Sequence, residues 1–118
     1  MQRNVSLDGR SDSERLDGEL SLLAVAECRY VCYYFGRNSD DEATLGELAE
    51  YVRRLDAPRV PDSRARIAAR LHHLAVPKLD EAGVVAYDEE GNTVTYRGSQ
   101  TLESLVAVTA DDECDALA

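Results

Sequence analysis

Apolar residues recur at helical spacing over the first third of the chain, after a polar start. Residues 1–13 contain glycine and show no period, which predicts a disordered segment. Between Ser13 and Gly36 the apolar positions fall on one broad helical face. This face consists of Leu16, Leu20, Leu23, Val31 and Phe35. Gly18 and residues 24–27 leave open that the stretch forms two helices.

A second helix is predicted where an acidic loop, residues 40–42, meets a new apolar stripe. Thr44 and Glu47 stand at the spacing of a capping box, in which each side chain bonds the backbone amide of the other residue. The stripe consists of Leu45, Leu48, Ala49 and Val52. Arg53 and Arg54 fall in the last turn, where cations suit the helix dipole.

A third helix is predicted after a connection that Pro58 and Pro61 bracket, with Asp62 or Ser63 as its N-cap. Its apolar positions are Ile67, Leu71, Leu74 and Leu79. Pro77 lies within this run and has no backbone N–H to donate. We therefore expect the helix to bend about one turn before the proline.

A β-hairpin is predicted directly after the third helix. Gly83 suits a left-handed helix end. Residues 84–87 and 93–96 are rich in β-branched and aromatic side chains. The turn between them holds Gly91 and Asn92, two residues that tolerate positive φ.

The last part of the chain predicts a short helix and a solvated end. Residues 100–108 fit a helix, and residues 110–118 fit an acidic disordered tail. The length allows one packed domain over residues 14–109, mainly α with a β-hairpin, in the order helix, helix, helix, hairpin, helix. No run approaches the about 18 apolar residues of a membrane span. We expect a cytoplasmic protein without membrane contact.

The charge balance of the chain is strongly acidic. It has 23 acidic and 13 basic residues, a net charge of -10, and Lys78 is its single lysine. An acid-rich, lysine-poor surface suits molar salt, in which charges are screened within about 3 Å. A halophilic source is expected, and a generic acidic protein from a GC-rich genome is the alternative.

The segment from Leu71 to Val85 reads LHHLAVPKLDEAGVV. It resembles the end of the recognition helix in many prokaryotic winged-helix regulators. The fragments His72-His73, Pro77-Lys78-Leu79, Ala82-Gly83-Val84-Val85 and Tyr87-Asp88 are similar to those of a winged-helix-like domain of unknown function from halophilic archaea.

This resemblance covers about residues 16–97 and implies a winged helix-turn-helix fold. DNA binding follows only through the wider winged-helix group, which is an argument from fold. Two positions depart from the pattern. Ala75 replaces a further polar residue, and Arg29 stands alone in place of an arginine pair, which puts contacts at both positions in doubt.

Positive charge concentrates in one segment of the chain. Residues 53–78 carry seven basic and two acidic side chains, whereas the remainder carries six basic and 21 acidic ones. Such clustering is typical of a DNA-binding surface. The candidate contacts are Arg64, Arg66, Arg70, His72, His73, Lys78 and Arg97. The alternative is a solvated face whose arginines pair with the abundant acids.

Two histidines stand side by side in the third helix. Adjacent positions point about 100° apart on a helix, so His72 and His73 do not easily bind one metal ion. We expect one of them to touch the core and the other to face outward.

Together these features predict a homodimeric transcriptional regulator whose third helix binds double-stranded DNA. The hairpin, residues 84–96, is expected to touch phosphate or the minor groove, and the first and last helices to form the dimer contact. Tyr30, Tyr33 and Tyr34 belong either to that contact or to the core. The acidic turn at residues 88–90 favours a rival, a winged-helix protein-interaction module that does not bind DNA.

Cys28 and Cys32 lie one helical turn apart in an apolar segment. The spacing allows a zinc site or a redox switch, but the sequence offers no clear set of four ligands, and a core role is favoured. The odd total of three cysteines agrees with a reducing compartment. The sequence has no glycine-rich phosphate loop, nucleophile elbow or HExxH motif, so neither an enzyme nor a cofactor is predicted.

Overall fold

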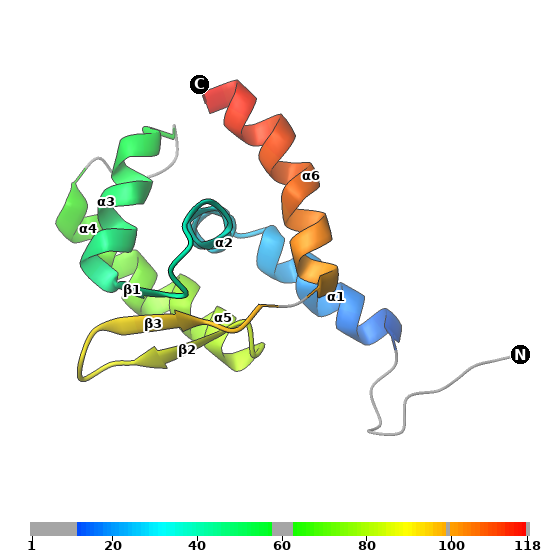
Figure 1. The fold of residues 1–118 in the computed structure, drawn as a ribbon, viewed down its shortest axis with the longest axis horizontal. Helices are drawn as coiled ribbons and strands as arrows, with labels where there is room; N and C mark the ends of the chain where they lie inside the picture. Colours follow the sequence, from blue (N-terminus) through cyan, green and yellow to red (C-terminus); the bar gives the residue numbers. More distant parts are fainter. Residues whose placement is uncertain (1–11, 58–62, 99, 118) are drawn as a thin grey trace, which may run out of the picture.

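The computed structural model describes residues 12–57, 63–98 and 100–117, and it is mainly helical with a small antiparallel sheet (Figure 1). The elements in chain order are α1 (Asp12–Leu23), α2 (Ala26–Arg37), β1 (Glu42–Thr44), α3 (Leu45–Leu55), α4 (Arg64–Arg70), the π-helical turn η1 (Leu71–Ala75), α5 (Val76–Glu81), β2 (Val85–Asp88), β3 (Thr93–Tyr96) and α6 (Gln100–Leu117). The predicted helices and hairpin are therefore present, and the sheet holds one strand more than predicted.

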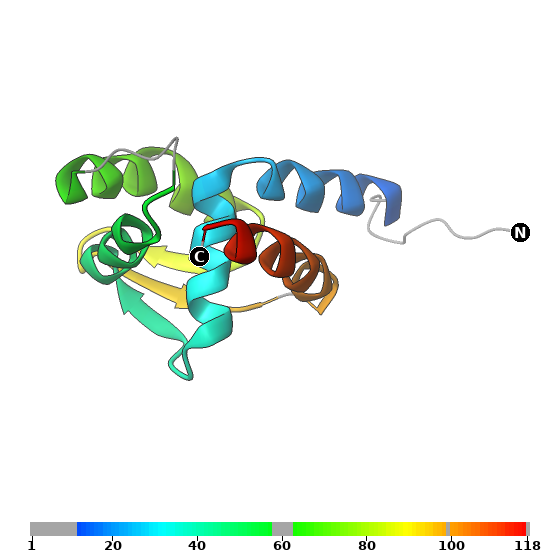
Figure 2. The same cartoon turned by 90° about the horizontal axis from the view of Figure 1, so that it is seen from above.

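The first predicted helix is in fact two helices, the alternative that the sequence left open. Val25 is extended, with φ -97° and ψ 118°, and serves as the N-cap of α2. The chain turns at residues 24–25, so α1 leaves α2 at a steep angle (Figure 2). Gly18 lies inside α1 and does not interrupt it. Asn38 caps the far end of α2, where its side-chain Nδ2 donates to Tyr34 O at 2.7 Å.

The capping box of α3 is confirmed. Glu47 N donates to Thr44 Oγ1 at 3.0 Å, and Thr44 N donates to Glu47 Oε1 at 2.8 Å. The short strand β1 precedes it, in a segment that the sequence assigned to an acidic loop. Only Ala43 of this strand is buried, so no alternation of apolar residues indicates it.

The third predicted helix is divided into α4, η1 and α5. Ser63 caps it, because its side-chain oxygen accepts from Arg66 N. Val76 N donates to Leu71 O, five residues earlier, which defines a π turn. Pro77 follows this turn and has no N–H for the carbonyl of His73. The turn in which the sequence predicted a bend is thus π-helical, a distortion at which helices commonly kink.

The sheet has the strand order β1-β3-β2, and both pairs are antiparallel. The predicted hairpin is present, and its strands pair from Val85↔Tyr96 to Asp88↔Thr93. Its first strand, Val85–Asp88, lies one residue later than predicted. Asn92 has a φ of 54°, as the predicted turn requires. Gly83, with a φ of 82°, ends the preceding helix, and Val84 N then donates to Leu79 O at 2.9 Å.

Helix α6 is longer than predicted. It continues to Leu117, where the sequence indicated a disordered acidic tail over residues 110–118. One carboxylate of this acidic segment, Glu113, forms an ion pair with Arg29 of α2. Of the predicted disordered start, residues 1–11 lie outside the described residues, and the next two begin α1.

Helix α2 lies at the centre of the fold. Helices α3 and α4 are on one side of it, and α1 and α6 are on the other (Figures 1 and 2). The core consists of fully buried side chains of α2 and of five elements around it: Cys28, Val31, Leu48, Val52, Ile67, Leu71, Leu79 and Val94. Within the described ranges, no helix has the length and apolar composition that crossing a membrane requires.

Candidate functional site

Helix α4 and the turn η1 bury one face and expose the other. Ile67, Leu71 and Ala75 are fully buried against the core. The residues that face outward are Arg64, Ala65, Arg66, Ala69, Arg70, His73 and Leu74. This exposed face of α4 and η1, hereafter the outer face, therefore combines basic side chains with two small alanines. It is the part of the predicted DNA-binding segment that the structure brings together.

Arg64 reaches back from the start of α4 to the start of α3. A Cβ atom placed on Gly46 would lie 2.8 Å from Arg64 Nη2, so the missing side chain at Gly46 makes room for the guanidinium. The neighbouring hollow has a volume of about 540 Å³ and is also lined by Glu47 and Glu50. Arg64 thus lies at the edge of the outer face, close to acidic groups.

The two arginines of α3 form ion pairs with a carboxylate of their own helix. Glu50 accepts from Arg53 Nη2 at 2.7 Å and from Arg54 Nε at 3.0 Å. The hydrogen bond from Arg53 is the main reason why the pKa of Glu50 is lowered to about 2. For this pair of arginines the alternative of a solvated, ion-paired face holds.

Arg70 bonds a carboxylate that is almost inaccessible to solvent. Its Nε donates to Glu27 Oε2 at 2.5 Å, and the side chain of Glu27 is 3% exposed whereas that of Arg70 is 46% exposed. The bond to Glu27 raises the pKa of Arg70 above its ordinary value. Glu27 lies in the first turn of α2, where the helix dipole favours a negative charge. The sequence did not indicate this partner, because 43 residues separate the two.

The two histidines take different roles, as their adjacent positions predict. His72 is half-buried, and its Nδ1 lies 2.7 Å from the hydroxyl of Tyr87 in β2. His73 is exposed on the outer face. His72 therefore connects η1 to the hairpin, and His73 is the one that faces solvent.

The last two candidate residues lie away from the outer face. Lys78 is half-buried in α5 and lines a hollow with Glu19 of α1 and Glu81. Arg97 is exposed just after β3, where its backbone N donates to Val84 O at 2.8 Å. The tip of the hairpin carries the exposed acids Asp88, Glu89 and Glu90.

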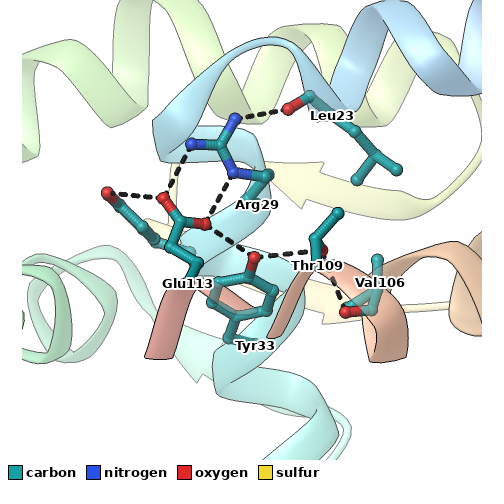
Figure 3. Close-up of polar contacts among 7 residues, drawn as sticks. Leu23, Arg29, Tyr33, Val106, Thr109 and Glu113 are labelled. Carbon is teal, nitrogen blue, oxygen red and sulfur yellow. Dashed lines mark hydrogen bonds and ion pairs between the residues drawn. The ribbon is translucent and has the colours of Figure 1, made fainter. Parts of the chain in front are cut away.

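A second polar cluster, which was not predicted from the sequence, joins α2 to α6 (Figure 3). Arg29 donates to both oxygens of Glu113, from Nε at 2.7 Å and from Nη2 at 2.8 Å. Tyr33 OH donates to Glu113 Oε1 at 2.7 Å, and Tyr30 OH donates to Oε2 at 3.3 Å. The bond from Arg29 is the first cause of the lowered pKa of Glu113. This cluster holds α6 against α2.

The tyrosines of α2 pack inside the fold of the single chain. Tyr30 and Tyr33 are buried, and the hydroxyl group of each donates a hydrogen bond to Glu113 of α6. Tyr34 is half-buried, with its ring 5.4 Å from that of Tyr51 in an edge-on arrangement. Of the two roles that the sequence allowed, the structure gives these rings the one in the core.

Cys28 and Cys32 are buried thiols. Cys28 Sγ donates to Ala75 O at 3.6 Å. Burial raises the pKa of Cys28 to about 11 and that of Cys32 to about 12. Among residues that the structure describes, no three His, Cys, Asp or Glu side chains are grouped as a metal site requires.

We expect both thiols to resist modification in the folded protein, because the reactive thiolate is disfavoured and the sulfur is covered. In a Cys114→Ser background, a thiol-specific chromogenic disulfide should react slowly under native conditions and rapidly in denaturant. The count of reacted thiols against time measures this. Fast native reaction of either cysteine would contradict the burial.

The comparisons with known proteins identify a family. A family model described as a domain of unknown function, DUF7344, matches residues 20–95. The chain belongs to this family. The DUF7344 match runs from the end of α1 into β3 and includes the outer face, whereas α6 with Glu113 lies beyond it. No curated protein and no solved structure matches the chain.

Proposed function

We propose that this chain is a winged helix-turn-helix DNA-binding regulator that inserts α4 and η1 into the major groove of double-stranded DNA. The order α2, β1, α3, α4 to α5, β2, β3 supports the fold, because a winged helix places its recognition helix just before a hairpin. In this arrangement α4 is the recognition helix and the β2–β3 hairpin is the wing.

The outer face is the observation that carries the proposal. Arg66 and His73 are exposed on it with Arg70, and the side chains of Ala65 and Ala69 are short enough to let DNA approach the helix closely. Arginine is the side chain that most often bonds guanine in the major groove, and it also binds phosphate.

The charge distribution favours a contact by the helix over a contact by the wing. The chain as a whole carries a charge of -10, and the tip of the hairpin is acidic, so the wing repels phosphate. Affinity then depends on a few specific contacts by α4, doubled in a homodimer that binds two half-sites.

The homodimer contact is proposed on α1 and α6, which lie across α2 from α3 and α4 (Figure 2). Leu20 of α1 is 47% exposed and Val108 of α6 is 64% exposed. A dimer through these helices leaves both recognition helices uncovered. Sedimentation equilibrium of the wild type and a Val108→Asp variant tests the contact.

The rival function is a protein-interaction module that keeps the fold without binding DNA. The specific observation in its favour is the acidic turn, because Asp88, Glu89 and Glu90 occupy the place where a phosphate-binding wing has basic residues. The pairing of Arg70 with Glu27 also lowers the positive charge of the outer face.

Replacement of Arg66 by alanine is expected to weaken binding to every duplex by a similar factor. If Arg66 contacts one phosphate, the slope of the log binding constant against log salt concentration should become less steep by about 0.9 in the variant. Fluorescence anisotropy measures both quantities, with labelled DNA from upstream of the chain's own gene and from a randomised library, between low and molar KCl.

Arg37→Ala is the matched control, because it removes the same charge from the exposed C-terminal end of α2. The proposal predicts that Arg37→Ala binds like the wild type. If the wild type binds no duplex at any salt concentration, or if the two variants behave alike, α4 is not a DNA-binding helix and the rival function is favoured.

A further inference from the structure

Arg70 differs from Arg66 because it forms an ion pair with a buried carboxylate, that of Glu27. Glu27 extends from the first turn of α2 and bonds Arg70 Nε. A buried carboxylate is costly unless it is paired, so this ion pair constrains both side chains. The guanidinium of Arg70 is therefore held at the surface in one orientation.

The bond to Glu27 leaves part of the guanidinium available. A guanidinium is a planar group with five N–H donors, and it can present two of them side by side to a second planar acceptor. In the described part of the chain only Nε of Arg70 forms a hydrogen bond. The terminal Nη groups of Arg70 can thus bind a ligand while Glu27 keeps the plane fixed.

The charge of this pair disfavours phosphate as the ligand. The carboxylate of Glu27 offsets the positive charge of Arg70, so the pair releases few counterions when it meets DNA. The pair of parallel N–H donors on the terminal Nη groups of Arg70 is kept. The planar acceptor in the major groove that matches two parallel donors is guanine, through O6 and N7.

We propose that Glu27 is a positioning residue that orients Arg70 to bond a guanine in the major groove, while Arg66 supplies a phosphate contact. The inference rests on the proposed DNA-binding function and adds its specificity. It assigns base selection to a pair of residues from α2 and α4, and not to the helix α4 alone.

The test compares Glu27→Gln with the wild type on two duplexes. One duplex is selected by the wild type from a randomised library, and the other has its best-discriminated G·C pair replaced by A·T. A bidentate contact contributes about 1–3 kcal/mol of discrimination, which corresponds to a factor of about 5–150 in the affinity ratio. Glu27→Gln should lose most of this ratio and show a steeper salt dependence, because Arg70 then acts as an uncompensated charge.

Asp111→Asn is the control, since it removes an exposed carboxylate from α6 and should keep the wild-type ratio. Arg70→Lys is the second variant. Lysine keeps the positive charge beside Glu27 but lacks the two parallel N–H donors of a guanidinium. Arg70→Lys should therefore also lose the difference in affinity between the two duplexes. It decides the question if Glu27→Gln fails to fold by circular dichroism.

The outcomes distinguish a failure of this inference from a failure of the proposed DNA-binding function. If the wild type binds no DNA, both proposals are wrong. If the wild type binds DNA without preferring any G·C pair, or if the folded variants keep the ratio, only the role of Glu27 and Arg70 is wrong. If Glu27 had only a structural role, its replacement would weaken binding to both duplexes equally and leave the affinity ratio unchanged.

Discussion

Truncation of Leu71 to alanine is expected to lower the free energy of unfolding by about 2–5 kcal/mol. Leu71 lies at the junction of α4 and η1, and it is fully buried. Its removal leaves a cavity where α4 and η1 meet the core, and the surrounding side chains relax only in part. Urea unfolding followed by circular dichroism measures the change.

Leu74→Ala is the matched control on the same turn. Its side chain is 37% exposed, so the same truncation should change stability by no more than about 0.5–1 kcal/mol. The difference between the two leucines follows from the orientation of the helix. Equal effects would contradict the placement of the buried and outer faces.

The second large effect is expected for Glu113→Gln. The carboxylate accepts from Arg29 and from the hydroxyl of Tyr33, and hydrogen bonds to charged groups contribute about 1.5–3 kcal/mol. The variant should lose about this amount at neutral pH. Hydrogen exchange of the α6 amides should also accelerate, because the helix loses its main polar contact with α2.

The pH dependence of this effect follows from the lowered pKa of Glu113. A carboxyl group whose pKa is lower in the folded state stabilises the fold above its unfolded pKa and loses this contribution as the pH falls through its folded pKa. The stability difference between the wild type and Glu113→Gln should therefore shrink on acidification.

Asp111→Asn serves again as the control, since Asp111 is exposed on the same helix. Its stability should match that of the wild type at every pH. If both substitutions had equal effects, or if the effect of Glu113→Gln grew in acid, the contact between α2 and α6 would be wrongly assigned.

Local signals in the sequence predicted much of the fold. The capping box at Thr44, the N-cap at Ser63 and the left-handed Gly83 are each specified within a few residues, and all are present. The hairpin followed from its β-rich strands and its turn. Strand β1 was missed because its pairing with β3 depends on tertiary contact and only one of its side chains is buried.

The roles of the charged residues depended on partners that are distant in sequence. The segment around Glu113 has the acidic composition of a solvated tail, although it is helical. Its contact with Arg29 could not be predicted because 84 residues separate the two side chains. Arg70 belongs to the basic segment of the sequence, but that segment gave no sign of its ion pair with Glu27. Charge counts locate a basic region, whereas only the packed structure shows which of its arginines are paired.

The structure also narrows the set of candidate contacts. Arg66 and His73 are on the outer face, and Arg70 is there with its carboxylate partner. Lys78 lies in a hollow beside α1, and Arg97 follows β3. The proposed interface therefore consists of the residues between Arg64 and His73.

The most direct test of DNA binding by α4 is the set of backbone amide chemical shifts in the protein titrated with its selected duplex. If α4 binds DNA, the largest shift changes fall between Arg64 and His73, with small changes over α6. Changes concentrated on α1 and α6, or none in α4 at saturating DNA, would contradict DNA binding by α4.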